Sequence, residues 1–353
     1  MELIQNRHDA IKQKNKIFFV ITIFFTAVAS MLRFFLIMFE VDPHTNLYVS
    51  SNLSLKIFDY GIAAVALFIW LSSKFMYVEK IRFVNVLMDT SDSQGTNADK
   101  TKKSKSTGNK YYEAAYTVVQ DTQSLVFSSA LTGCFLLGAS IMQGIAVFTD
   151  PIWTNNLGGY VKENTFDFAL FFVAILSAVY FFKTAYLKAA GNNSDDADNS
   201  APKLSQGYII FSFFPVIWTF LNIFKCFFDM SKSVNSPIRI YELVSFLAIS
   251  LYFVAESRML VGRRETGKFF SSAYMAILLI SLSSLPHLVL SAFWILETST
   301  PLMVYGVQLS FLIYIASRIY SQIKYGEFLL VKIPTFEKSE KPKETESELP
   351  ESQ

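Results

Sequence analysis

The stretch "IFFVITIFFTAVASMLRFFLIMF" (residues 17–39) is the first long apolar run of the chain, and Arg33 is its only charged residue. A helix needs about 20 apolar residues to cross the hydrocarbon core of a bilayer. The run is long enough for this, and it lacks the small-residue cleavage site of a secretory signal peptide. We therefore predict that it forms a retained transmembrane helix.

Further runs of similar length and composition follow it. They cover residues 56–77, 124–148, 166–187, 206–228, 238–258, 269–295 and 302–320. Each must be helical, because lipid offers no hydrogen-bond partner to an unpaired backbone group. Hydrophobic residues make up 52% of the chain, which is too apolar for a soluble protein of this length. The sequence thus predicts an all-α integral membrane bundle of eight transmembrane helices.

Lysine and arginine gather at both ends of the chain and in the loops after the second, fourth and sixth runs. By the positive-inside rule, both termini are predicted to be cytoplasmic. The loop at about 90–110, the linker 188–205 and the tail 333–353 are polar, and we predict that they are disordered. The lysine-rich loop is either a solvated linker or a contact for anionic headgroups. The linker would divide the chain into two four-helix halves, 1–187 and 206–322.

Three stretches of the first half match stretches of the second half in the same order. They are "SMLRFFLIM" (30–38) with "NIFKCFFDM" (222–230), "IFDY" (57–60) with "IYEL" (240–243), and the "FSSA" shared by 127–130 and 270–273. These matches place Arg33 opposite Lys225, and Asp59 opposite Glu242. Two interpretations are open: a 4+4 parallel repeat of the kind found in some transporters, or the shared composition of apolar helices.

One long stretch resembles a known family. Residues 213–272, "FFPVIWTFLNIFKCFFDMSKSVNSPIRIYELVSFLAISLYFVAESRMLVGRRETGKFFSS", contain an aromatic helix that ends in a basic residue, a Tyr-Glu opening of the next helix, and an Arg-Arg-x-x-x-x-Phe link. In these features the stretch resembles an uncharacterised family of bacterial multi-pass membrane proteins. The resemblance implies a location in the bacterial cytoplasmic membrane and implies no activity.

Ionisable side chains inside a span cost at least about 2.5–3.5 kcal/mol at the bilayer centre, so each one needs an explanation. By their predicted depth, the polar residues gather in the outer half of the spans. This candidate cluster consists of Arg33, Asp59, Asn222, Lys225, Glu242 and His287. Arg33 either snorkels to the headgroups or pairs with Asp59. Lys225 has the same two alternatives, with Glu242 as its partner.

Two prolines lie inside predicted spans, and we expect helix kinks at Pro215 and Pro286 because proline removes a backbone donor and crowds the preceding turn. His287 follows the second proline. It is either a hydrogen-bonded packing residue or a ligand or proton carrier. No second histidine or carboxylate lies at metal-ligand spacing from it, so we predict no metal site and no cofactor.

Function is constrained less than location. No nucleophile and base pair, phosphate-binding glycine loop or cofactor motif is visible, so we do not expect an enzyme. The 31 basic and 29 acidic residues nearly balance, so net charge gives no reason to expect a nucleic-acid partner. The lipid bilayer is the expected partner. Our leading hypothesis is a transporter of small solutes or lipids, or a sensor, with an outward-facing polar cavity. The alternative is a non-catalytic partner subunit, in contact with another membrane protein or with copies of itself.

Overall fold

The structure is a computed structural model that describes residues 2–42, 47–48, 53–76, 123–149, 165–192, 206–228, 236–260, 266–293 and 300–325. Its helices are α1 (Glu2–Glu40), α2 (Leu53–Met76), α4 (Gln123–Thr149), α7 (Thr165–Asn192), α8 (Gln206–Phe211), α9 (Phe214–Phe228), α10 (Pro237–Leu260), α11 (Thr266–Ala292) and α12 (Leu302–Tyr325). No strand occurs within the described ranges, which confirms the prediction of an all-α fold.

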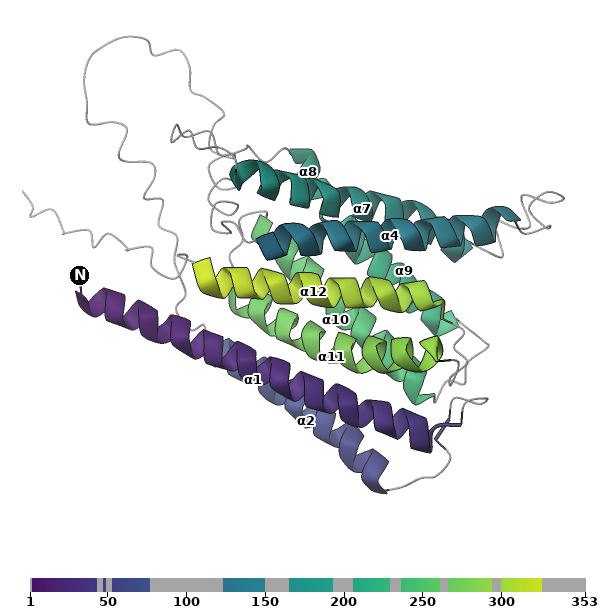
Figure 1. Ribbon diagram of the computed structural model, residues 1–353, viewed down its shortest axis with the longest axis horizontal. Coiled ribbons are helices and arrows are strands. Elements are labelled where there is room, and N and C mark those ends of the chain that lie inside the picture. Colours follow the sequence, from purple (N-terminus) through teal and green to yellow (C-terminus); the bar gives the residue numbers. More distant parts are fainter. Residues whose placement is uncertain are drawn as a thin grey trace, which may run out of the picture.

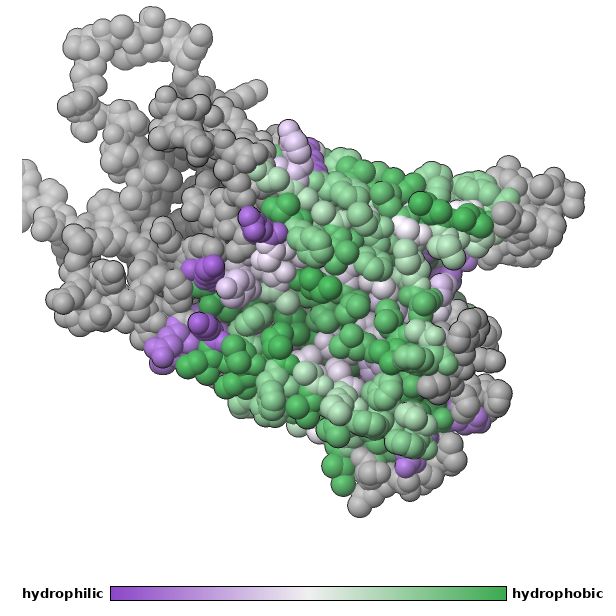
Figure 2. Space-filling view, in the orientation of Figure 1, coloured by the Kyte–Doolittle hydropathy of each residue, from purple (hydrophilic) through white to green (hydrophobic). Residues whose placement is uncertain are grey.

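Eight helical segments of the described chain are long and apolar enough to cross a membrane. They coincide with the eight predicted runs, α8 and α9 together forming the fifth. Figure 2 shows hydrophobic residues across the middle of the molecule and hydrophilic residues toward its two ends. The chain is therefore a multi-pass membrane protein, as predicted.

The segments predicted to be disordered lie mostly outside the described residues. This holds for the loop at 90–110, for the tail 333–353 and for residues 193–205 of the linker. Helix α7 extends to Asn192, so the first residues of the linker are helical.

Figure 1 shows the start of α1 and the end of α12 at the same end of the bundle, on the left, and we call it the terminal end. At the opposite end α1 finishes and α2, α10 and α12 begin, and we call this the distal end.

Helix α11 lies at the centre of the packing and contacts α1, α2, α10 and α12. Helix α12 also packs on α4, which in turn packs on α7. Within the most apolar stretch of each helix, the buried share of the residues is 67% in α11 and 22% in α2. The buried core therefore lies among α4, α7, α9, α10, α11 and α12, while α1 and α2 run along its edge (Figure 1).

Small residues allow close approach of α4 and α7, as expected for helices in lipid. A Cβ atom on Gly133 would lie 2.9 Å from Cζ of Phe182, and one on Gly144 would lie 2.8 Å from Cε2 of Phe171. Real Cβ contacts are not this short, so a larger residue at either position would require the facing phenylalanine ring or the two helices to shift.

The two prolines have different local settings. The fifth span is interrupted at Ser212 and Phe213, two residues before Pro215, and this interruption separates α8 from α9. A proline ring crowds the turn before it and supplies no N–H to the helix. Pro286 lies inside α11, which continues as one helix from Thr266 to Ala292.

The packing gives the predicted 4+4 repeat no support. Helix α10 packs on α9 and on α11, its neighbours in the sequence. Helix α2 is the counterpart of α10 in the repeat, but its main contact is with α11 rather than with α1 or α4. The two halves of the chain are therefore packed differently.

Candidate functional site

Arg33 is turned into the bundle near the distal end and is only 2% exposed. Its guanidinium carbon lies 3.3 Å from the centroid of the Tyr241 ring in α10. The Tyr241 hydroxyl in turn donates a 2.8 Å hydrogen bond to Oδ1 of Asp59 in α2. Arg33 thus faces inward, but its contact is with the Tyr241 ring and not directly with Asp59. We call Arg33, Tyr241 and Asp59 the distal latch.

The distal latch joins α1 and α2 to α10. Arg33 and Asp59 form no direct ion pair in the described part of the chain, and the Tyr241 ring lies between them. Nη2 of Arg33 also donates a 3.4 Å hydrogen bond to the backbone carbonyl of Pro237. Tyr48, between α1 and α2, faces the same guanidinium, and burial raises the pKa of its phenol. The arginine is thus surrounded by an aromatic face and neutral oxygens.

Glu242 and His287 meet around Tyr305 of α12. The Tyr305 hydroxyl donates to Oε1 of Glu242, and the Cys226 thiol lies 3.5 Å from Oε2. The His287 ring is stacked on the Tyr305 ring, with centroids 5.4 Å apart. Glu242 is 1% exposed and His287 is fully buried. We call Glu242, Tyr305, His287 and Cys226 the distal cluster, and it brings together α9, α10, α11 and α12.

The geometry of His287 identifies the ring nitrogen that carries a proton. Nδ1 lies within hydrogen-bond distance of the Ser283 carbonyl oxygen, one turn earlier in α11. Because a carbonyl oxygen only accepts, Nδ1 must be the donor. These contacts are those of a hydrogen-bonded packing residue, which was one of the two interpretations of this histidine.

The remaining two predicted site residues lie apart from Glu242. Lys225 forms an ion pair with Asp167 of α7, and the side chains of the pair are 39% and 31% exposed. Asn222 donates a 2.8 Å hydrogen bond to the carbonyl of Trp218 in its own helix. The pairing of Lys225 with Glu242, one of its two sequence interpretations, does not occur in the structure, because α7 supplies a carboxylate beside Lys225.

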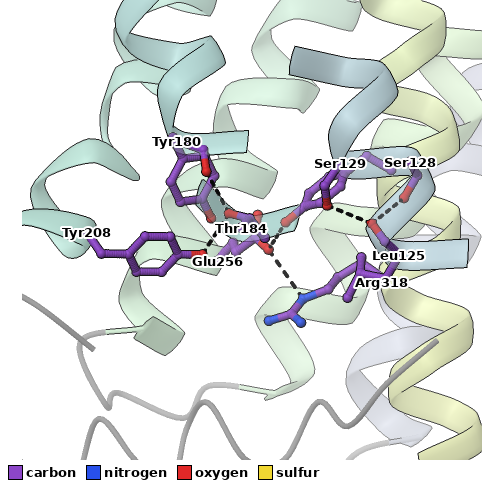
Figure 3. Close-up of polar contacts among 9 residues, drawn as sticks. Leu125, Ser128, Ser129, Tyr180, Thr184, Tyr208, Glu256 and Arg318 are labelled. Atoms are coloured by element: carbon purple, nitrogen blue, oxygen red, sulfur yellow. Dashed lines mark hydrogen bonds and ion pairs between the residues drawn. The ribbon is translucent and has the colours of Figure 1, made fainter. Parts of the chain in front are cut away.

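A buried charge pair lies toward the terminal end (Figure 3). Nε of Arg318 in α12 lies 3.3 Å from Oε1 of Glu256 in α10. The Tyr314 hydroxyl donates a 2.7 Å hydrogen bond to the same oxygen. Glu256 is 2% exposed and Arg318 is 8% exposed. We call Glu256, Arg318 and Tyr314 the terminal cluster.

Further tyrosines surround the terminal cluster, as Figure 3 shows for two of them. The rings of Tyr180 in α7 and Tyr208 in α8 are stacked with centroids 5.3 Å apart. The hydroxyls of Tyr208 and Thr184 lie 2.8 Å apart and share a hydrogen bond. Tyr252, one turn before Glu256 on α10, is fully buried. Four helices thus present phenols to one charge pair.

Polar contacts connect α10 with α12 at both ends of the core. Positions 242, 245, 249, 252 and 256 lie on one face of α10 by their spacing. Besides the two clusters, Nε2 of Gln308 donates a 3.3 Å hydrogen bond to Oγ of Ser245. We call this row of α10–α12 contacts the polar seam. Its two carboxylates are separated by about 21 Å of helix, at 1.5 Å per residue.

Aromatic rings occupy the middle of the seam. Phe253 of α10 and Phe311 of α12 have ring centroids 5.1 Å apart. Trp218 of α9 lies against Phe311, at 5.7 Å between centroids, and against Phe246 of α10, at 6.0 Å. These four residues form what we call the aromatic layer. Along both helices they lie between the distal cluster and the terminal cluster.

Sequence reasoning missed the terminal cluster. Glu256 and Arg318 lie near the ends of their predicted spans, where charged residues are common, and so neither one required an explanation. A usable signal was present in the spacing of Glu242, Ser245, Tyr252 and Glu256, which puts four polar residues on one helix face. Tyr241 was missed because a tyrosine at the start of a span resembles an ordinary interfacial aromatic residue.

Within the described residues, no three His, Cys, Asp or Glu side chains are placed to hold a metal ion together. The chemistry that the polar seam offers is that of buried carboxylates, phenols, one guanidinium and one imidazole. Comparisons of the chain with protein-family models, with curated proteins and with solved structures find no match. The resemblance of residues 213–272 to a bacterial family therefore stays a prediction from the sequence.

Proposed function

We propose that this protein is a transporter of small polar solutes, with a passage along the polar seam that the aromatic layer closes. The supporting observation is the arrangement of polar groups around that layer. Each side of it has a buried carboxylate on the same face of α10, within reach of α12. In this proposal one polar cluster lies on each side of the barrier, in place of the single outward-facing polar cavity that we expected from the sequence.

The free-energy cost of placing polar side chains inside a bilayer favours this proposal over a purely structural role. Polar side chains in the bilayer interior are expensive, and they mark solute or ion pathways. A passage for polar solutes requires hydrogen-bonding groups on both sides and a barrier between them, and the seam has both.

Orientation follows from the loop charges. We place both termini in the cytoplasm, so that the distal cluster faces outward and the terminal cluster faces the cytoplasm. The membrane would be the bacterial cytoplasmic membrane.

Thiol labelling tests the proposal without knowledge of the substrate. Cys134 and Cys226 are replaced by serine, and Ser245→Cys places one thiol in the seam. Ser177→Cys is the matched control, because both serines are fully buried and both bond to a carbonyl of their own helix. We expect a membrane-impermeant thiol reagent to modify Ser245→Cys from one or both sides of the membrane, and to leave Ser177→Cys unmodified. Complete protection of both thiols would reject the passage.

The second candidate function is that of a partner subunit. It is favoured by α1 and α2, whose most apolar windows are only 28% and 22% buried and leave wide apolar faces outside the core. A partner subunit would co-purify with another membrane protein, or with tagged copies of itself, in mild detergent. It would lose that contact when residues 90–110 or 338–353 are deleted, while Ser245→Cys stays protected.

A further inference from the structure

We infer that Glu256 is the binding site for a coupled proton, and that its charge state controls the position of Arg318. The inference rests on the proposed transport function and deepens it, because it names the proton as the ion that drives the solute. A proton needs no preformed cavity. It needs a buried base, a route to solvent and a neighbouring group that responds to the change of charge.

The two oxygens of Glu256 have unequal surroundings. Oε1 faces both Arg318 and the Tyr314 hydroxyl. Oε2 is buried and accepts no hydrogen bond of good geometry in the described part of the chain, although the Tyr252 hydroxyl one turn earlier lies close enough to interact with this carboxylate. A buried carboxylate oxygen without a donor is costly, since it has lost its water and gained nothing in return. A proton on Oε2 removes that cost, and the new O–H becomes a donor.

The other groups near Glu256 leave Arg318 as its single counter-charge among the described residues. Its titratable neighbours are Tyr180 of α7, Tyr208 of α8, Tyr252 of α10, and Tyr314 and Arg318 of α12. The four phenols carry no charge in their protonated form. The charge balance of the terminal cluster therefore depends on one carboxylate and one guanidinium.

Protonation changes this balance in a defined way. The proton comes from solvent at the terminal end and forms an O–H bond at Oε2, and no other bond breaks. Arg318 then loses its counter-charge while it is still nearly buried, which is unfavourable for a guanidinium. Figure 3 shows that Arg318 meets Glu256 through Nε, with the end of the guanidinium beyond that contact. Because Arg318 is more exposed than Glu256, it moves outward toward the terminal end when the attraction is lost.

Movement of Arg318 would be transmitted along α12. Tyr314 lies one turn before Arg318 and contacts the aromatic layer, with its ring centroid 6.3 Å from that of Phe253. Phe311, which belongs to the layer, lies a further turn along the same helix. A shift of α12 at Arg318 would thus reach the barrier that closes the passage.

Infrared difference spectroscopy of the purified full chain in lipid nanodiscs tests the proton site directly. On acidification we expect a carboxylic-acid C=O band to appear as carboxylate absorption is lost. Glu256→Gln should abolish that band, Glu256→Asp should shift it, and Glu40→Gln, at the end of α1, should leave it unchanged. The Glu242→Gln variant shows how much of the band comes from the second carboxylate. A Glu256→Gln spectrum equal to that of the parent would overturn the inference, and Glu256→Asp covers the case in which the glutamine variant does not fold.

Labelling of Ser245→Cys at several pH values separates this inference from the transport proposal. Thiol reagents react with the thiolate, so the labelling rate at each pH is divided by that of a solvent-exposed reference cysteine. We expect this ratio to depend on pH in the parent background and to lose that dependence with Glu256→Gln. Labelling with the same pH response in both backgrounds would retain the passage and reject the proton coupling. A Glu256 band together with a thiol that is never labelled would retain the proton site and reject transport.

Discussion

The distal latch and the terminal cluster contain the same three kinds of group, arranged differently. In the latch a tyrosine ring separates Arg33 from Asp59, and three helices are joined at the edge of the core. In the terminal cluster Arg318 contacts Glu256 directly, and Tyr314 donates to the same carboxylate oxygen. Asp59 is half-buried, whereas Glu256 is almost completely buried.

This difference suggests separate roles. Arg33 can be lost from the latch at moderate cost, because the Asp59 that remains is half-buried and is not in direct contact with it. Charges in direct contact within the core depend on each other. The latch is therefore suited to hold α1 and α2 in place, and the terminal cluster is suited to respond when one charge changes.

The largest effect is expected for Arg318→Met. It leaves Glu256 buried without a counter-charge, so the free energy of unfolding should fall by about 3–5 kcal/mol at neutral pH. SDS-driven unfolding of the purified protein in mixed micelles measures this loss. The double variant with Glu256→Gln should recover most of it. A double variant as unstable as the single one would show that the charge pair is not the cause.

Arg33→Met should lower the free energy of unfolding by less, about 2 kcal/mol, which is the contribution of a desolvated cation over an aromatic ring. Asp59 is then left without the nearby guanidinium, but it is half-buried near the distal end. The same unfolding measurement applies. Arg33→Lys keeps the charge and loses the planar stack, so it should recover only part of the loss. Full recovery with lysine would contradict the stacking.

Replacing Tyr314 or Tyr241 by phenylalanine keeps the ring and removes only the hydrogen bond of the hydroxyl, so the two variants compare these hydrogen bonds. Tyr314→Phe should cost about 1.5 kcal/mol, the low end for a hydrogen bond to a charged group, because Arg318 remains on the same oxygen. Tyr241→Phe keeps the ring under Arg33 and should cost about 0.5–1 kcal/mol. Tyr186→Phe is the control, since Tyr186 is 72% exposed, and it should change stability by less than about 0.5 kcal/mol. A larger loss for Tyr241 than for Tyr314 would reverse the comparison.

The smallest effect is expected for Lys225→Met. Its ion pair with Asp167 is partly exposed and should contribute about 0–1 kcal/mol. The loss should shrink further in high salt, because exposed charges are screened. Asp167→Asn should produce the same change. A loss as large as that of Arg33→Met would place Lys225 among the buried charges.

Much of the fold follows from hydropathy, and the exceptions are local. All eight spans were predicted, including the last one, whose Gly306 and Gln308 interrupt the apolar run. Among the residues of the candidate polar cluster, Arg33 and Asp59 lie in one latch, and Glu242 and His287 lie in another cluster. Their shared partners, Tyr241 and Tyr305, were missed because a tyrosine within an apolar helix is not unusual as a single residue.

The sequence by itself determined the eight helices of the described chain that are long and apolar enough to cross a membrane. This is possible because lipid forces each apolar run to satisfy its own backbone, so the decision is local. Only the tertiary structure decided which side chains meet. Arg33 bonds to a carbonyl 204 residues away, and Tyr314 reaches a carboxylate 58 residues away. Such contacts depend on how the helices pack, and an apolar helix can pack in many ways when its surroundings are as apolar as its partners.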